Sequence, residues 1–102
     1  MPLEIWKLTL EWGHTNIKMP DHARVLSTAF QGENLRIWAV VVPSNMQRER
    51  GFSVIATGEP NDKAIGNFVG TAFHPAGLVF HVFDHGYASS PQGSADPSEA
   101  KS

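Results

Sequence analysis

The residues of this chain best suited to chemistry are its histidines, of which there are five. The most suggestive pair is His81 and His85, because on a helix this spacing would aim both rings at one metal ion. The surrounding apolar run predicts a strand, on which the same two positions lie ~13 Å apart and Asp84 points to the other face. Nothing in the spacing of the other histidines indicates a ligand set. We therefore expect no metal site, with histidines in loops or on the surface and His81 on a partly buried sheet face.

A nucleophile or a pair of catalytic carboxylates is equally hard to find. Serine, histidine and aspartate are present, but there is no G-x-S-x-G motif and no strand-to-helix turn that would expose a nucleophile. Asp84 stands alone, without a second carboxylate. Gly66 and Gly70 match no phosphate-binding pattern and fall on a predicted strand, where they indicate a bend or a bulge. The sequence thus predicts no catalytic residue and no cofactor, and we expect that the chain is not an enzyme.

The length and net charge of the chain narrow the classes of function that remain. The chain has 102 residues, which is enough for one small domain with a single core. A net charge of −2 argues against nucleic-acid binding, because phosphate-binding surfaces usually show a basic excess. Arg48 and Arg50 form the only close pair of like positive charges, and Glu49 lies between them.

Cysteine usage and hydropathy bear on location. The chain has no cysteine, which rules out disulfides, a thiolate nucleophile and a cysteine zinc site, and makes a reducing cytoplasm the default expectation. Charged residues interrupt the apolar N-terminal run at strand spacing, so it does not match a signal peptide. No stretch approaches the ~20 apolar residues that cross a bilayer. We expect a cytoplasmic protein with no membrane partner.

The elements that must position any site are strands. The segment 24–43 predicts two long strands joined by the tight turn Gly32 to Asn34, a strong hairpin pattern. Leu26, Thr28 and Phe30 are expected to share one face of the first strand. In the second strand alternate residues share each face. One set is Leu35, Ile37, Ala39 and Val41, and the other is Trp38, Val40 and Val42.

Five further strands follow from similar patterns of alternation. Each is bounded by glycine, proline or other turn residues. They are expected at 3–12, 16–19, 52–57, 65–73 and 78–83. Trp6 and Trp12 should share the buried face of the first, and 74–77 should form a second hairpin turn. Segment 44–51 reads as a polar loop with one helical turn.

These elements predict an all-β domain of about seven mostly antiparallel strands. Such a chain folds as a small sandwich or barrel. We expect this domain to cover residues 1–87. Residues 88–102 contain no large apolar side chain and are expected to be a disordered tail.

Two of the strands, 35–42 and 78–83, are apolar on both faces. A sandwich strand needs only one apolar face, so either the chain curls to cover both or another molecule covers one of them. In the second case, their outer residues would form a partner surface with aromatic and arginine anchors. The candidate partner-binding residues are Arg36, Trp38, Val40, Val79, His81 and Phe83, together with Arg48 and Arg50.

Several short segments, in a fairly specific order over residues 4–85, resemble a known family. They are Met19-Pro20 with Ala23 and Leu26, Leu35 to Ala39 running to Pro43, Ala56 to Gly58, Gly70-Thr71 and Leu78 to Phe83. The family consists of small uncharacterised proteins, described as a domain of unknown function, from tailed phages and prophages. It has no assigned catalytic residues, so none can be transferred. The resemblance implies an accessory protein made in a bacterial cytoplasm.

The function expected from these observations is binding. The first hypothesis is a phage-type accessory protein that modulates or inhibits a host bacterial protein. A surface of this kind could instead mediate self-association. Capture of a small ligand such as a nucleotide signal is the alternative, and it requires a pocket. A small hydrolase comes third.

Overall fold

The fold is described from a computed structural model, which defines residues 2–60 and 66–88. These residues contain seven β-strands and no helix, which confirms the all-β prediction. All strand pairings are antiparallel. The strands are β1 (Glu4–Leu10), β2 (Gly13–Pro20), β3 (Arg24–Gln31), β4 (Asn34–Val41), β5 (Gln47–Ala56), β6 (Asn67–Phe73) and β7 (Val79–Tyr87).

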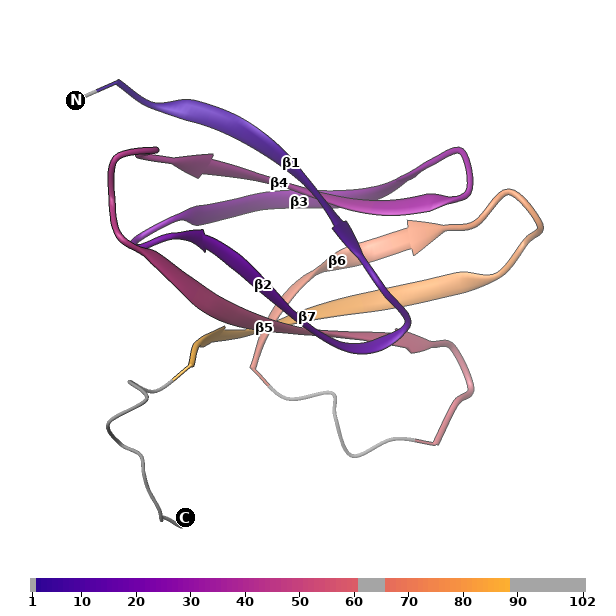
Figure 1. Ribbon diagram of the computed structural model, residues 1–102. Coiled ribbons are helices and arrows are strands. Elements are labelled where there is room, and N and C mark those ends of the chain that lie inside the picture. Colours follow the sequence, from indigo (N-terminus) through magenta and orange to yellow (C-terminus); the bar gives the residue numbers. More distant parts are fainter. Residues whose placement is uncertain (1, 61–65, 89–102) are drawn as a thin grey trace, which may run out of the picture.

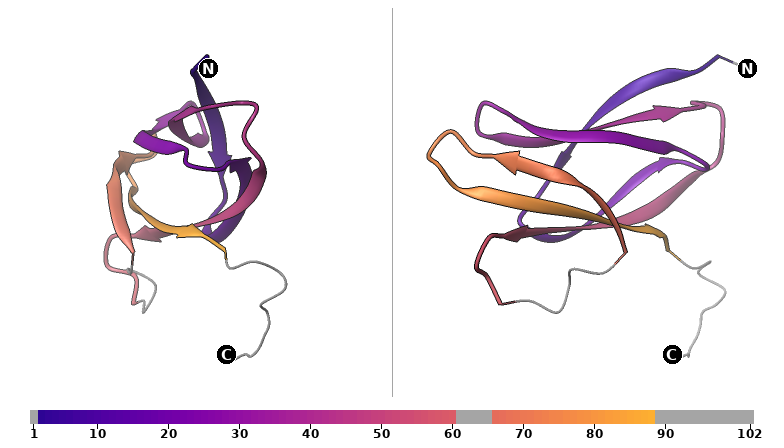
Figure 2. Two further views of the ribbon diagram at one scale, coloured as in Figure 1. Left: turned by 90° about the vertical axis from the view of Figure 1, so that its left-hand side faces the viewer. Right: turned by 180° about the vertical axis from the view of Figure 1, so that it is seen from behind.

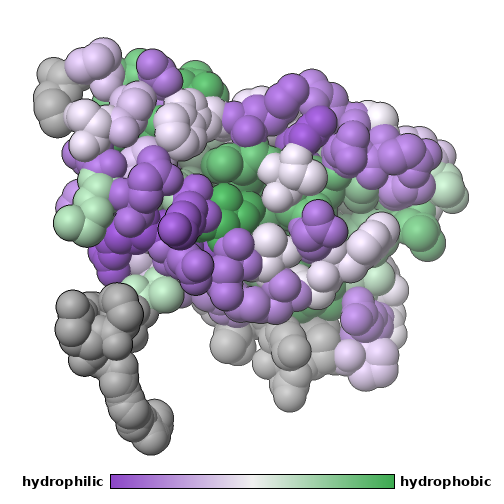
Figure 3. All heavy atoms as spheres, in the orientation of Figure 1, coloured by the Kyte–Doolittle hydropathy of each residue, from purple (hydrophilic) through white to green (hydrophobic). Residues whose placement is uncertain are grey.

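The strands form two sheets that enclose one core (Figure 1 and Figure 2). The three-stranded sheet has the order β1-β4-β3, and the four-stranded sheet has the order β2-β5-β7-β6. β3 packs alongside β6, whereas β1 and β2 diverge from the short link between them, so the sheets do not close into a barrel. In the orientation of Figure 1, a band of hydrophobic surface runs across the middle of the molecule between hydrophilic residues (Figure 3).

The central hairpin forms as its sequence predicts. β3 and β4 pair down to Gln31 and Asn34, and Gly32 occupies the turn with a φ of 63°. Such a positive φ costs glycine little, because it has no Cβ. Burial alternates strictly along β4, so that every second residue lies in the core. The buried set is Leu35, Ile37, Ala39 and Val41, as expected.

The core lies between the sheets and takes apolar residues from every strand. Met19 from β2, Phe52 from β5 and Val82 from β7 are fully buried. Phe52, Val54 and Ala56 all lie in or against the core, as the alternation of β5 predicts. Burial of these side chains stabilises the sandwich by ~1.5–3 kcal/mol for each large residue.

The prediction of a polar loop at 44–51 is wrong from Gln47 on. β5 begins at Gln47, and its residues 47–54 pair with β2, with Lys18 opposite Glu49. The charged residues that made this segment read as a loop find partners far away in the sequence. Arg50, for example, is bound to Asp84. β7 is likewise longer than expected and runs to Tyr87.

Two apolar residues lie outside the positions expected for them. The register of β3 shifts between Val25 and Ser27, so Val25 packs against the core and Leu26 is 43% exposed. Such a bulge reverses the alternation on one side of it. Trp12 is 61% exposed, since β1 ends at Leu10 and the indole lies in the link to β2.

Gly70 marks a bulge in β6, as expected. The register shifts between Phe68 and Gly70, and a Cβ on Gly70 would meet the Thr28 methyl group of β3 at 3.1 Å. Gly70 thus allows the edges of the two sheets to approach. The expected tail at 88–102 lies, apart from Ala88, outside the described residues. Over the described part of the chain there is no helix long and apolar enough to span a membrane.

Candidate functional site

The predicted partner-binding residues do not form one surface. Trp38 points outward from the three-stranded sheet, since the alternate residues of β4 are buried, whereas Phe83 points outward from the four-stranded sheet. The two sheets pack through their inner faces, so these outer faces lie on opposite sides of the sandwich. Arg48 and Arg50 lie in neither surface and belong to a third group of residues around Tyr87.

The outer face of the three-stranded sheet combines positive charge with apolar side chains. Directly opposed residues of antiparallel strands lie on one face. Lys7 lies opposite Trp38, and Ile5 and Arg24 both lie opposite Val40. We call this surface the cationic face. It consists of Ile5, Lys7, Arg24, Arg36, Trp38 and Val40.

The positive charges of the cationic face are not neutralised by nearby carboxylates. Lys7 Nζ donates to Gln31 Oε1 at 3.0 Å, and Arg36 Nε donates to the same oxygen at 3.2 Å. Arg36 also donates to Thr9 Oγ1. These acceptors are neutral. Lys7, Arg24 and Arg36 form no ion pair with any residue in the described ranges. The amide and the hydroxyl orient the cations but leave their charge available to a partner.

The arginines of β5 are used differently. Arg48 Nη1 lies 3.0 Å from Asp21 Oδ1, and Arg50 contacts both carboxylate oxygens of Asp84, at 3.1 and 2.6 Å. The side chains of the second pair are only 12% and 7% exposed. Burial acts to lower the pKa of Arg50, but the hydrogen bond and charge of Asp84 outweigh it and raise that pKa above its ordinary value. Asp84, for which the sequence predicted no carboxylate partner, is thus paired with an arginine.

Tyr87 completes this group, which we call the Tyr87 cluster: Asp21, Arg48, Arg50, Asp84 and Tyr87. Both guanidinium groups lie 4.8 Å from the centre of the Tyr87 ring. The Tyr87 hydroxyl donates to the Pro20 carbonyl and accepts from the Ala23 N–H at 3.0 Å. The cluster joins β5 and β7 to the β2–β3 link. Its polar groups are satisfied internally, so its geometry fits a structural role.

The outer face of the four-stranded sheet is also largely satisfied internally. His81 lies between two hydroxyl groups, with Nε2 2.7 Å from Thr57 Oγ1 and Nδ1 3.0 Å from Thr71 Oγ1. This is the partly buried sheet position expected for it. Phe83 packs against Phe68, with ring centroids 5.6 Å apart. These contacts leave the predicted binding residue His81 with both ring nitrogens engaged.

One contact on this face resembles a catalytic pair and was not anticipated. Ser53 Oγ and His85 Nε2 are 2.5 Å apart, although 32 positions separate them in the sequence. Ser53 is only 1% exposed, so a substrate carbonyl has no path to its hydroxyl. Within the described residues, no carboxylate is hydrogen-bonded to His85. The contact is therefore better explained as satisfaction of a buried hydroxyl than as a nucleophile and its base.

The histidines also fail to form a metal centre in the part of the chain that the structure describes. His14 and His85 are the nearest pair, with ring centroids 5.5 Å apart, and His14 Nε2 lies 3.1 Å from Asn16 Oδ1. No group of three or more potential ligands occurs among the described residues. Sequence spacing could not have revealed this pair, since β5 lies between β2 and β7.

No curated protein and no solved structure matches the chain. A family model described as Domain of unknown function (DUF7352) matches residues 1–92, and nothing in that match indicates a phage or prophage origin. The match extends over the whole of the described sandwich, from β1 to β7. The chain therefore belongs to the DUF7352 family.

Proposed function

We propose that this chain is a binding module, without catalytic activity, that engages an acidic protein partner through the cationic face. The observation that carries the proposal is the set of three cations, Lys7, Arg24 and Arg36, that surround Trp38 without an ion pair in the described ranges. Elsewhere on the sandwich, Arg48 and Arg50 each have a carboxylate partner. Unpaired charge concentrated on one sheet face supports a role outside the fold.

The composition of the cationic face suits a protein more than a small molecule. Tryptophan and arginine are the residues that most often dominate protein interfaces. Trp38 is half-buried and Ile5 is 64% exposed, so the face offers both an anchor and an apolar surface around it. Trp38 lines neither the pocket beneath Trp12 nor the one beside Arg50 and Asp84, which argues against a small ligand at this position.

Charge complementarity indicates the kind of partner. A partner rich in aspartate and glutamate would be steered toward the three cations and would compensate them on contact. A second copy of this chain would instead oppose the cations to each other across a twofold axis, at a cost in free energy. The net charge of −2 shows that the chain has no overall basic excess, which disfavours a nucleic-acid surface.

The resemblance to phage and prophage proteins supplies a biological setting for this proposal. In that setting the chain is an accessory protein of the bacterial cytoplasm, and its acidic partner is a host protein that it modulates or inhibits. The lack of cysteine agrees with a reducing compartment. The bacterial setting and the host partner extend the binding proposal, and they can be tested once a partner has been identified.

The test is a capture experiment with matched variants. The wild-type chain, Trp38→Ala and Phe68→Ala are immobilised and exposed to bacterial lysate, and retained proteins are identified by mass spectrometry. Phe68 is the control because it is a 59% exposed aromatic residue on the other sheet. We expect one acidic protein retained by the wild type and by Phe68→Ala, and lost with Trp38→Ala.

Binding of the purified candidate is then measured by calorimetry. Trp38→Ala should weaken binding by ~2 kcal/mol or more. Arg36→Ala should weaken binding and also reduce the dependence of the affinity on salt concentration. A partner retained equally by wild type and Trp38→Ala, or lost only with Phe68→Ala, would contradict the proposal.

A further inference from the structure

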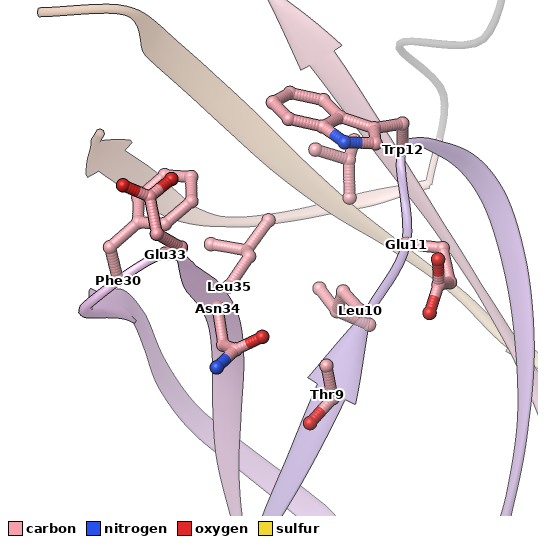
Figure 4. A pocket seen from close by; sticks show the side chains of 9 residues that line it. Thr9, Leu10, Glu11, Trp12, Phe30, Glu33, Asn34 and Leu35 are labelled. Carbon is pink, nitrogen blue, oxygen red and sulfur yellow. The ribbon is translucent and has the colours of Figure 1, made fainter. Parts of the chain in front are cut away.

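A small cavity opens at the end of the sandwich away from the Tyr87 cluster. It lies between the β1–β2 link and the β3–β4 hairpin and has a volume of about 140 Å³. Its floor is apolar, because Leu10, Leu35 and Val54 are all buried core residues (Figure 4). The volume lies below the ~300 Å³ at which pockets for drug-sized ligands begin. The cavity therefore has room for one small chemical group.

Two aromatic rings form opposite sides of the cavity (Figure 4). Trp12 contacts the ring of Phe80 edge-on, with centroids 4.3 Å apart. Phe30 lies 5.8 Å from Phe80 and 5.0 Å from the His74 ring, also by centroids. The same buried phenylalanine thus supports both walls. Trp12 remains 61% exposed although it is supported in this way, which leaves much of its surface available to a ligand.

The rim of the cavity is acidic. Glu11 and Glu33 both line it, and Glu33 belongs to the same side of the cavity as Phe30 (Figure 4). His74 Nε2 is 2.8 Å from Glu33 Oε1, while the N–H of Ala76 donates to His74 Nδ1 at 2.9 Å. Because Nδ1 accepts a hydrogen bond in this arrangement, Nε2 is the ring nitrogen that faces Glu33. His74 therefore orients the Glu33 carboxylate at the rim.

We propose that this cavity binds the head group of an organic cation, an alkylammonium or a guanidinium. Aromatic faces attract cations through the negative electrostatic potential above the ring, and tryptophan does so most strongly. The Glu33 carboxylate adds a charge of the right sign, and the apolar floor accepts methyl or methylene groups. The cation can belong to a free small molecule or to a lysine or arginine side chain of a peptide. Both sources present the same chemistry to the cavity.

This site is independent of the cationic face. It prefers the opposite sign of charge and shares no residue with that surface, although Arg36 donates to Thr9, which lines the cavity. A failure of one proposal therefore leaves the other standing. Trp38 serves as the internal control, because it is a second tryptophan outside the cavity.

The probe for the test is choline, compared with 3,3-dimethylbutan-1-ol, its neutral analogue of the same shape. Binding is followed by NMR on the full chain labelled with ¹⁵N, through the Trp12 indole N–H and the backbone amides of Leu10 and Leu35. We expect saturable shifts with choline at a Kd on the order of 1–10 mM, and much weaker shifts with the alcohol. N-acetyl-lysinamide and N-acetyl-argininamide, titrated in parallel, would show by a tighter Kd that a peptide side chain is the better source.

Variants separate a site from a nonspecific effect. Trp12→Ala should weaken choline binding by about tenfold and Glu33→Gln by about threefold, whereas Trp38→Ala should leave it unchanged. The dispersion of the amide spectrum checks that each variant is folded. The proposal is overturned if the neutral alcohol binds as well as choline, if neither choline nor the amino-acid amides saturate, or if Trp12→Ala binds like the wild type.

Discussion

On the four-stranded sheet, Arg48 and Arg50 are bound to carboxylates. On the three-stranded sheet, Lys7 and Arg36 donate only to neutral side chains. Positive charge thus has two different roles within one small domain. In the Tyr87 cluster it holds distant segments together, and buried charge there requires a partner. On the cationic face it stabilises little, since exposed charges contribute at most ~1 kcal/mol.

The largest loss of stability that this comparison predicts follows from the replacement of Asp84. Asp84→Ala leaves the Arg50 guanidinium buried without its partner, which should lower the free energy of unfolding by ~3–5 kcal/mol. The measurement is urea unfolding followed by tryptophan fluorescence. A loss below about 1 kcal/mol would mean that water replaces the carboxylate and that the pair is not structural.

The pH dependence sharpens this prediction. The pKa of Arg50 is raised in the folded chain, so the stability that it contributes is fully present below the ordinary guanidinium pKa. That contribution is lost only as pH rises through the raised value. The difference in unfolding free energy between wild type and Asp84→Ala should therefore be the same at neutral pH and in mildly alkaline solution. A difference that shrinks over this range would show that another group controls the cluster.

A smaller loss of stability is expected when the Tyr87 hydroxyl, which bonds to the segment between β2 and β3, is removed. Tyr87→Phe keeps the ring beneath both guanidinium groups but removes the bonds to Pro20 and Ala23. We expect a loss of ~1–3 kcal/mol, because a buried N–H and a carbonyl lose their partner. Amide exchange at Ala23 should accelerate in this variant. An unchanged exchange rate would indicate that the hydroxyl bonds do not hold the β2–β3 link.

The smallest effect should come from the other side of the comparison. Lys7→Ala removes an exposed cation that donates to the Gln31 amide, so the free energy of unfolding should change by no more than ~0.5 kcal/mol. Thermal melting can measure it beside Asp84→Ala. A loss that approaches the effect of Tyr87→Phe would show that the cationic face has a structural role, and would weaken the argument for an external partner.

Much of the fold could be predicted because alternation along single strands is a local property. The buried set of β4 and the turn at Gly32 follow from it directly. β5 could not be recognised over 47–51, since the partners that stabilise its arginines, Asp21 and Asp84, are distant in the sequence. The position of Leu26 was also missed, because a bulge inverts the alternation and leaves no clear trace in residue types.

For the candidate surfaces, the sequence predicted which residues point outward but not which sheet each belongs to. Trp38 and Phe83 looked equivalent, as aromatic residues on strands with two apolar faces. Sheet order separates them, and it depends on pairings between distant strands. The Ser53–His85 contact and the cavity below Trp12 were invisible for the same reason. Both combine residues from elements that only the folded chain brings together.

The central claim is that Trp38 serves binding more than folding. It is tested most directly by measuring both properties on Trp38→Ala, with the partner identified by capture. The account predicts an affinity loss of ~2 kcal/mol or more, with a folded monomer whose melting temperature falls by less than the ~4–8 °C that corresponds to 1 kcal/mol. A variant that loses ~3–5 kcal/mol of stability, as for a tryptophan in the core, while the remaining folded protein binds its partner normally would contradict it.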